Sequence, residues 1–316
     1  MANEFSLINK YFKPLGEAIA SPNVVMGIGD DCALLANKPG YQLAVSTDTM
    51  VAGVHFFADA HPIDVGYKAL AVNLSDLAAM GAEPAWFTLC LTLPGRDENW
   101  IKGFVQGIEI LAQQFAIPLV GGDTTKGPLS LSIQVAGWVP EDKGLTRSGA
   151  KVGDHLYVSG EIGWPYLGYQ VSTSSLQLND ADQREGLERF LRPLPKLALG
   201  ANLIDVASAA LDISDGLTAD LNHMLTASGI GAELDINALP LAAPLGAMSD
   251  DIQRQAINFG DEYQLLFAVP SDKQTQLTAL QEQLSIKLYP IGTLVDGPGI
   301  VDSQGNPIAP SGYEHF

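Results

Sequence analysis

Residues 61–93, "HPIDVGYKALAVNLSDLAAMGAEPAWFTLCLTL", decide the fold class of this protein. The part from 61 to 81 predicts a helix, with Pro62 near its start and Gly81 just past its end. The apolar run at 85–93 predicts a strand. Because the run "YQLAVST" at 41–47 also predicts a strand, strand, helix and strand alternate here. This order indicates an α/β or α+β fold.

The alternation continues on both sides of a polar interruption. The segment 140–154, "PEDKGLTRSGAKVGD", breaks the pattern, so we expect an N-terminal domain of residues 1–140 and a C-terminal domain of residues 150–316. Before it we expect a helix at 97–116 and strands at 117–123 and 129–139. After it we expect a strand at 155–160, a helical region to about 207, the strand "AALDI", a helix at 216–229, and strands in "YQLLFAVP" and "KLYPIGTLV".

Composition and charge bound the function. A chain of 316 residues, 47% of them hydrophobic, can form two domains with real cores. The formal net charge of −19 disfavours nucleic acid and anionic membranes as partners. The cysteines Cys32 and Cys90 lie in apolar runs, so we expect two buried free thiols in a reducing compartment. Without a leader pattern or a long apolar run, we expect a cytoplasmic protein.

One pattern recurs, an apolar strand that ends in an acid beside a small residue. It occurs in "AVSTDT" (44–49), "PLVGGDTT" (118–125) and "ALDISDG" (210–216), and more loosely in "MGIGDD" (26–31). A single such acid is more often a turn former or a helix N-cap, and Asp215 before "GLTADL" fits that explanation. Because strand ends meet at the rim of a sheet, four of them together predict that these acids converge on one site.

Asp76 adds a carboxylate to an apolar helix stripe. Val65, Ala69, Val72 and Met80 share its side at three- and four-residue spacing. A buried charge needs a partner, which can be Asn73, a backbone amide or a cation. With only 17 basic residues in the chain, a divalent cation is the favoured partner.

Several converging acids imply several cations, because two carboxylates about 4 Å apart repel by roughly 4 kcal/mol at an effective dielectric constant near 20. Oxygen ligands select a hard ion, Mg²⁺ before Ca²⁺. The natural ligand of several Mg²⁺ ions is a polyphosphate, so the acids predict a nucleotide site that works through metal.

The common nucleotide motifs are absent from the sequence. "GLTRSGAKV" (144–152) lacks the spacing of a P-loop, and "GIGDDC" puts Cys32 where a dinucleotide fingerprint has its third glycine. A protein-kinase catalytic loop is also missing. Any nucleotide site must therefore have another architecture.

Seven segments together resemble the bacterial thiamine-monophosphate kinases, which share a superfamily with aminoimidazole ribonucleotide synthetase and selenophosphate synthetase. The resemblance runs from about residue 4 to the C-terminus. It rests on "GIGDDCALL", "VSTDTMVAGVHF", "NLSDLAAMGAEP", "LVGGDTT", "ALDISDGL", "GDEYQLLF" and the terminal "GYEHF".

The resemblance implies a fold and an activity. It implies a two-domain α/β (α+β) fold, with an N-terminal mixed sheet and helices that pair in a homodimer and a C-terminal sandwich-like α/β domain that completes the active site. The implied reaction is direct in-line transfer of the ATP γ-phosphoryl group to thiamine monophosphate, giving thiamine diphosphate, with several Mg²⁺ ions required.

The resemblance also implies roles for individual residues. The implied metal ligands are Asp30, Ser46, Thr47, Asp48, Asp76, Asp123, Asp212 and Asp215, of which Asp48, Asp123 and Asp215 are the implied catalytic residues. The implied ATP contacts are Gly122, Asp123, Arg147 and Ser214, and the implied contacts to the thiamine substrate are His55, Asp261, Glu262 and Tyr313.

One segment departs from the family pattern. The family usually has Gly-Gly-Glu-Asp-Tyr-Glu-Leu-Leu, whereas residues 259–266 read "FGDEYQLL", with the two acids exchanged and Gln264 in place of the last glutamate. The substrate contact of the first acid would fall on Asp261, with Glu262 as the alternative.

Two other functions stay open at this point. One is another ATP-dependent enzyme of the superfamily with a different acceptor, such as an aminoimidazole ribonucleotide synthetase-like enzyme. The other is a non-catalytic acidic metal-binding protein. The second would be expected to have contiguous ligand loops, whereas these acids are scattered from position 30 to 215.

Overall fold

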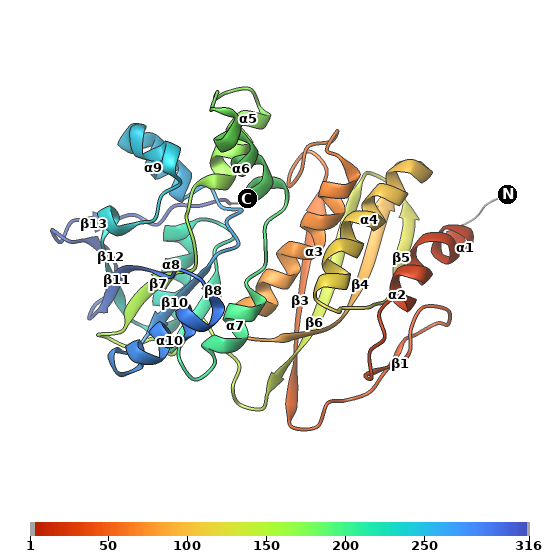
Figure 1. Ribbon diagram of the computed structural model, residues 1–316, viewed down its shortest axis with the longest axis horizontal. Helices are drawn as coiled ribbons and strands as arrows, with labels where there is room; N and C mark the ends of the chain where they lie inside the picture. The colour runs from red at the N-terminus through yellow and green to blue at the C-terminus, as the bar shows by residue number, and fades with distance from the viewer. Residues whose placement is uncertain (1–3, 315–316) are drawn as a thin grey trace. The chain divides into compact units, whose positions relative to one another are not determined.

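The computed structural model describes residues 4–314, and the chain divides into two compact units. The first consists of Met1–Leu77 and Ala82–Asp142, and the second of Ala78–Gly81 and Lys143–Phe316. Each unit combines helices with β-sheet (Figure 1), which confirms the predicted two-domain α/β class.

The first unit is built on a four-stranded mixed sheet of strand order β3-β6-β4-β5. Strands β4 and β5 are parallel because helix α4 connects them, and the other pairs are antiparallel. The elements are α1 Glu4–Leu7, η1 Ile8–Phe12, α2 Lys13–Glu17, β1 Val24–Met26, β2 Leu34–Leu35, β3 Tyr41–Val51, α3 Pro62–Ala79, β4 Glu83–Leu93, α4 Glu98–Gln114, β5 Leu119–Lys126 and β6 Ser130–Pro140.

Helices α3 and α4 pack tightly against each other and lie on one face of this sheet (Figure 1). Two glycines allow the close approach. A Cβ atom on Gly66 would lie 2.0 Å from the main-chain oxygen of Phe104, and one on Gly107 would lie 2.0 Å from that of Ile63. Helix α3 is buried on all sides from residue 65 to 75, and this buried stretch includes the polar residues Lys68, Asn73 and Ser75.

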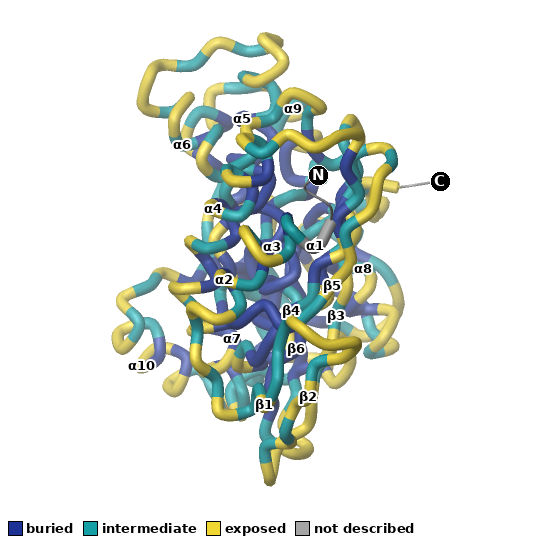
Figure 2. The backbone as a smooth tube through the Cα atoms, turned by 90° about the vertical axis from the view of Figure 1, so that its right-hand side faces the viewer, coloured by how far each residue is buried: buried dark blue, intermediate teal, exposed yellow. Residues whose placement is uncertain are grey.

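The other face of the sheet is less covered. The β1–β2 hairpin contains no buried residue, as its teal and yellow colouring in Figure 2 shows. Val24, the first residue of β1, and Ala33, just before β2, pack on a small buried cluster that includes Trp86 and Trp138. Along β3 the odd-numbered side chains from Leu43 to Thr49 remain exposed.

The second unit is built on a seven-stranded sheet of order β13-β12-β9-β11-β7-β10-β8. Helix α8 places an apolar stripe, Leu217, Leu221, Met224 and Leu225, in the core of this unit. The elements are β7 His155–Val158, α5 Trp164–Ser172, α6 Asp180–Leu191, α7 Leu197–Leu203, β8 Ala209–Asp212, α8 Leu217–Ser228, β9 Gly231–Leu234, η2 Ile236–Ala238, η3 Ala243–Ala247, α9 Asp250–Ile257, β10 Leu265–Val269, η4 Ser271–Lys273, α10 Gln274–Leu284, β11 Tyr289–Val295, β12 Gly299–Asp302 and β13 Pro307–Ile308.

Two expectations from the sequence are wrong. Asp48 and Asp123 lie inside β3 and β5 rather than at strand ends, because pairing with β6 and β4 extends both strands beyond the apolar run. Cys32 and Cys90 are exposed rather than buried. Cys90 pairs with Ser132 and Asp123 on the sheet face away from α3, and Cys32 lies in the loop after β1.

Among residues 4–314, none of the helices is both long enough and apolar enough to span a bilayer.

Candidate functional site

A pocket lies at the β5 edge of the first unit. It has a volume of about 130 Å³, and its walls come from the glycine-rich loop 27–33 and from β5. Asp30 and Asp31 line it from the loop, and Gly122 and Asp123 line it from the strand. The structure therefore brings together Asp30 and Asp123, which are 93 positions apart in the sequence, on one concave surface with exposed carboxylates.

Gly122 is required by the backbone at this place. Its φ of 151° lies in the region that favours glycine, and a Cβ atom would lie 1.9 Å from the main-chain oxygen of Leu89 on β4. The glycine lets β5 approach β4 closely beside the pocket, and it leaves the main chain of this segment uncovered by a side chain.

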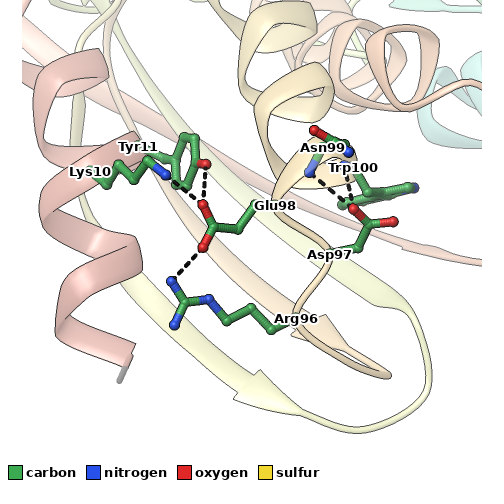
Figure 3. Close-up of polar contacts among 7 residues, drawn as sticks. All are labelled: Lys10, Tyr11, Arg96, Asp97, Glu98, Asn99 and Trp100. Carbon is green, nitrogen blue, oxygen red and sulfur yellow. Dashed lines mark hydrogen bonds and ion pairs between the residues drawn. The ribbon is translucent and has the colours of Figure 1, made fainter. Parts of the chain in front are cut away.

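The N-terminal helical segment closes one side of the pocket with Ile8 and Phe12. Its position is held by Glu98 at the start of α4, as Figure 3 shows. One carboxylate oxygen of Glu98 accepts from Lys10 Nζ and from Tyr11 Oη at 3.1 Å, and the other accepts from Arg96 at 2.8 Å. These bonds lower the pKa of Glu98.

A second group of candidate ligands lies where β3 meets α3. Ser46 Oγ donates to the Asp76 carboxylate, so Ser46 is one partner of Asp76. Asn73, which is buried, accepts from the main-chain N–H of Asp48 at 3.1 Å and donates to the carbonyl of Ala69 at 2.9 Å. Since side chains alternate along a strand, Ser46 and Asp48 share one face of β3.

Thr47 lies on the opposite face of β3 and is exposed, so its side chain does not join Ser46 and Asp48. The two groups in this unit are also apart from each other. Strands β3 and β5 are the two edges of a four-stranded sheet, about 14 Å apart at ordinary strand spacing. The structure does not bring Asp48 and Asp76 together with Asp30 and Asp123.

In the second unit, the candidate ligands surround the loop between β8 and α8. Asp212 is the last residue of β8 and is buried, and Asp215 follows in the loop. One ligand atom each of Asp215, Asp220 and His223 lie within 4.8 Å of one another. Burial raises the pKa of Asp220 to about 6, although three backbone N–H groups favour its ionised form.

Asp220 and His223 were not among the residues singled out from the sequence. The signal that could have found Asp220 is its place in the first turn of the helix after "SDG", where a carboxylate can accept from main-chain N–H groups of the preceding loop.

The two nucleotide candidates of the second unit lie in different surroundings. Ser214 lies in the β8–α8 loop and its N–H donates to Asp220. Arg147 is exposed, and its carbonyl accepts from Ser228 Oγ at 3.4 Å.

Asp261 and Glu262 point in different directions, which distinguishes the two exchanged acids. Glu262 is buried, and its carboxylate accepts from the N–H of Gly163 at the start of α5 at 2.5 Å. Burial raises the pKa of Glu262 to about 8. Asp261 is only half-buried and accepts from Tyr263 Oη at 3.1 Å.

The other two substrate candidates are accessible. Tyr313 is 45% exposed, and its N–H donates to the carbonyl of Asp215 at 2.9 Å. His55 is half-buried, and its Nδ1 accepts from the N–H of Val51 at 3.0 Å. That bond leaves Nε2 as the protonated nitrogen of the neutral ring. Residues 315 and 316 of the "GYEHF" motif lie outside the described part of the chain.

Comparisons with known proteins agree with this architecture. Two family models match, the N-terminal domain of AIR synthase related protein at residues 29–139 and the C-terminal domain of the same family at residues 151–303. Thiamine-monophosphate kinase of Salmonella typhimurium is 44% identical over 321 aligned positions, which cover 99% of this chain and 98% of the relative.

Solved structures extend the likeness to three dimensions. Thiamine-monophosphate kinase from Stenotrophomonas maltophilia K279a superposes with a TM-score of 0.88 at 40% identity, covering 96% of this chain and 98% of that one. AaThiL complexed with AMPPCP and TMP superposes with a TM-score of 0.79 at 28% identity, covering 99% and 97%. With identity of this level over nearly its whole length, the chain belongs to the thiamine-monophosphate kinase family.

Proposed function

We propose that this chain transfers the γ-phosphoryl group of ATP to thiamine monophosphate and so forms thiamine diphosphate. The observation that carries the proposal is its 44% identity to a thiamine-monophosphate kinase over 99% of the chain. A structure of the family with 28% identity contains AMPPCP and TMP. The AMPPCP is an analogue of ATP that cannot lose its γ-phosphoryl group by ordinary transfer.

The donor set fits Mg²⁺. The candidate ligands in both units are carboxylate and hydroxyl oxygens, which a small hard cation prefers over nitrogen or sulfur ligands. We assign the cations to Asp30, Ser46, Asp48, Asp76, Asp123, Asp212 and Asp215. Thr47 is left out of this set because its side chain lies on the face of β3 opposite to that of Ser46. When bound, Mg²⁺ supplies positive charge that offsets the repulsion between two phosphorylated substrates.

The chain's own groups bind and align the reactants. In the pocket at β5, the uncovered main chain at Gly122 can approach a nucleotide closely, and we assign Arg147 and Ser214 to the nucleotide as well. We assign His55, Asp261 and Tyr313 to thiamine monophosphate. Glu262 is given a supporting role instead, because its carboxylate is buried against Gly163.

The chemical step needs little from side chains as acids or bases. The second pKa of a phosphate monoester lies near 6, so the attacking oxygen is already ionised at neutral pH. Catalysis then consists of holding the two phosphates in line and neutralising the charge of the transferred group. We assign Asp48, Asp123 and Asp215 to this task as the residues that would hold the cations, since carboxylates without cations would repel the phosphates.

The test is an assay of the purified protein with ATP, Mg²⁺ and separate acceptors: thiamine, thiamine monophosphate and purine-pathway acceptors. We expect thiamine diphosphate to form when thiamine monophosphate is the acceptor, and no product to form from the other acceptors. Chelation of Mg²⁺ should abolish this activity. Turnover of another acceptor instead, or Mg²⁺ binding without any turnover, would refute the proposal.

We also propose a homodimer formed through the first unit. Tyr41, Leu43 and Val45 are 39%, 43% and 52% exposed on one face of β3, which is more apolar surface than an edge strand normally leaves in water. Light scattering should give twice the chain mass for the wild type. The Val45→Asp variant should shift to the monomer mass. Thr49→Asp, four residues further along the same face, places the same charge outside the apolar patch and should keep the dimer mass.

A further inference from the structure

The loop between β8 and α8 is held by one carboxylate oxygen. Oδ2 of Asp220 accepts from the N–H groups of Ser214, Asp215 and Gly216 at 3.1, 3.0 and 3.1 Å. Asp220 is 4% exposed, so water cannot readily replace it at these N–H groups. Three consecutive N–H groups that converge on one point fix the backbone of the whole loop.

The carbonyl groups of the same loop hold two other segments. Ile213 O accepts from Tyr263 N at 2.8 Å, Ser214 O accepts from Asp261 N at 2.9 Å, and Asp215 O accepts from Tyr313 N at 2.9 Å. The segment 261–263 and the C-terminal segment are therefore both fastened to the loop by main-chain bonds. Asp261 and Tyr263 have positive φ values of 59° and 49°, a conformation that such bonds must stabilise.

The loop thus lies between a proposed metal ligand and the proposed acceptor residues. Its side chain at position 215 is a candidate metal ligand, and its carbonyls set the positions of Asp261 and Tyr313. A shift of the loop backbone would move Asp215 together with Asp261 and Tyr313. Misplacement of such groups by about 1 Å is enough to slow an enzyme markedly.

We propose that Asp220 is a positioning residue, which aligns the metal ligand Asp215 with the acceptor-binding residues Asp261 and Tyr313 through the loop backbone. The expected change in enzyme kinetics rests on the proposed kinase function. The expected change in loop stability does not. The rival role for Asp220 is that of a direct metal ligand with Asp215 and His223, whose ligand atoms lie within 4.8 Å.

Two variants at position 220 and one control at position 154 separate these roles. Asp220→Asn keeps an oxygen that can accept from the same three N–H groups but removes the negative charge. Asp220→Ala removes the acceptor. Asp154→Ala is the matched control, because Asp154 is also buried in this unit and accepts a backbone N–H, that of Lys151 at 3.0 Å.

The kinetic experiment measures kcat, the KM for thiamine monophosphate and the Mg²⁺ concentration for half-maximal activity. For Asp220→Ala we expect the KM for thiamine monophosphate and the Mg²⁺ concentration for half-maximal activity both to rise about tenfold, with a lower kcat. Asp220→Asn should stay within about threefold of the wild type, and Asp154→Ala should change neither quantity. An Asn variant as impaired as the Ala variant, or an Ala variant with wild-type constants, would overturn the proposal.

Hydrogen exchange gives a readout that does not depend on catalysis. In Asp220→Ala, amides of residues 214–216, 261–263 and 313 should exchange faster together, while Asp220→Asn and Asp154→Ala should keep the wild-type protection of these amides. If the wild type has no kinase activity, the proposed function fails, and the exchange data still decide the positioning role. If Asp220→Ala does not fold, Asp220→Glu, in which an added methylene displaces the carboxylate, takes its place; unchanged protection and kinetics in it would refute the role.

Discussion

Glu262 makes the stability of the protein depend on pH in a direction opposite to that of most carboxylates. Its pKa is raised from 4.5 to about 8, chiefly because the side chain is buried, while the Gly163 N–H partly opposes the shift. A folded-state pKa above the unfolded-state value means that the protonated form is the stabilised one. The contribution of Glu262 is therefore complete below pH 4.5 and is lost as pH rises to about 8.

The magnitude follows from the shift. Between these two pH values the native state binds one more proton than the unfolded state at this group, so stability falls by about 1.4 kcal/mol per pH unit. The full loss is about 5 kcal/mol as an upper bound. Glu262→Gln keeps an oxygen for the Gly163 N–H but cannot ionise, so its stability should not contain this slope.

The assay is urea unfolding of the wild type and Glu262→Gln at several pH values from mildly acidic to mildly alkaline. The free energy of unfolding of Glu262→Gln should rise relative to that of the wild type as pH increases. Glu161→Gln removes an exposed carboxylate from the β7–α5 loop, which contains Gly163, and controls for the loss of one negative charge. A constant difference between wild type and Glu262→Gln over the whole pH range would show that Glu262 is ionised in the folded protein, and would refute the reasoning.

Three further substitutions test the packing described above. Gly122→Ala places a Cβ atom 1.9 Å from a main-chain oxygen, so thermal unfolding should show a loss of about 3 kcal/mol, and an unchanged Tm would contradict the close approach. Gly107→Ala should cost about as much, because its Cβ would lie 2.0 Å from a carbonyl oxygen of α3; the same scan checks it against an exposed helical control, Gln106→Ala. Asn73→Ala leaves the N–H of Asp48 without its acceptor and should cost about 2 kcal/mol in urea unfolding, whereas a neutral result would mean that water replaces the amide.

The elements with strong periodicity could be predicted from the sequence. Helix α3 was predicted at 61–81 and spans Pro62–Ala79, and β4 was predicted at 85–93 and spans Glu83–Leu93. Apolar period, a proline at the start and a glycine after the end are local signals, so no tertiary information was needed. The short elements β9, β12 and β13 of the second unit carry weak patterns of this kind and were not predicted.

The candidate site was predictable in its chemistry but not in its arrangement. Residue types identified Asp30 and Asp123, but the contact between their loop and strand depends on how β5 joins the sheet. Likewise, "STDT" at 46–49 predicts a strand end, yet β3 continues to Val51 because its backbone pairs with β6 as far as Ser130. Tertiary pairing overrides local pattern in such cases. Which of two adjacent acids turns inward, as Glu262 does, depends on the N–H groups that the fold leaves nearby.

The main-chain character of the bonds around the β8–α8 loop affects how the sequence can change. Every residue except proline has a main-chain N–H, so the bonds from positions 261, 263 and 313 do not themselves depend on the side chain, although the positive φ values at 261 and 263 disfavour β-branched residues there. Acids at 261 and 262 can therefore trade places over evolution without loosening this junction. A relative with another residue at position 261 or 313 can therefore keep the same backbone path, because the hydrogen bonds that fix this path do not involve the side chain.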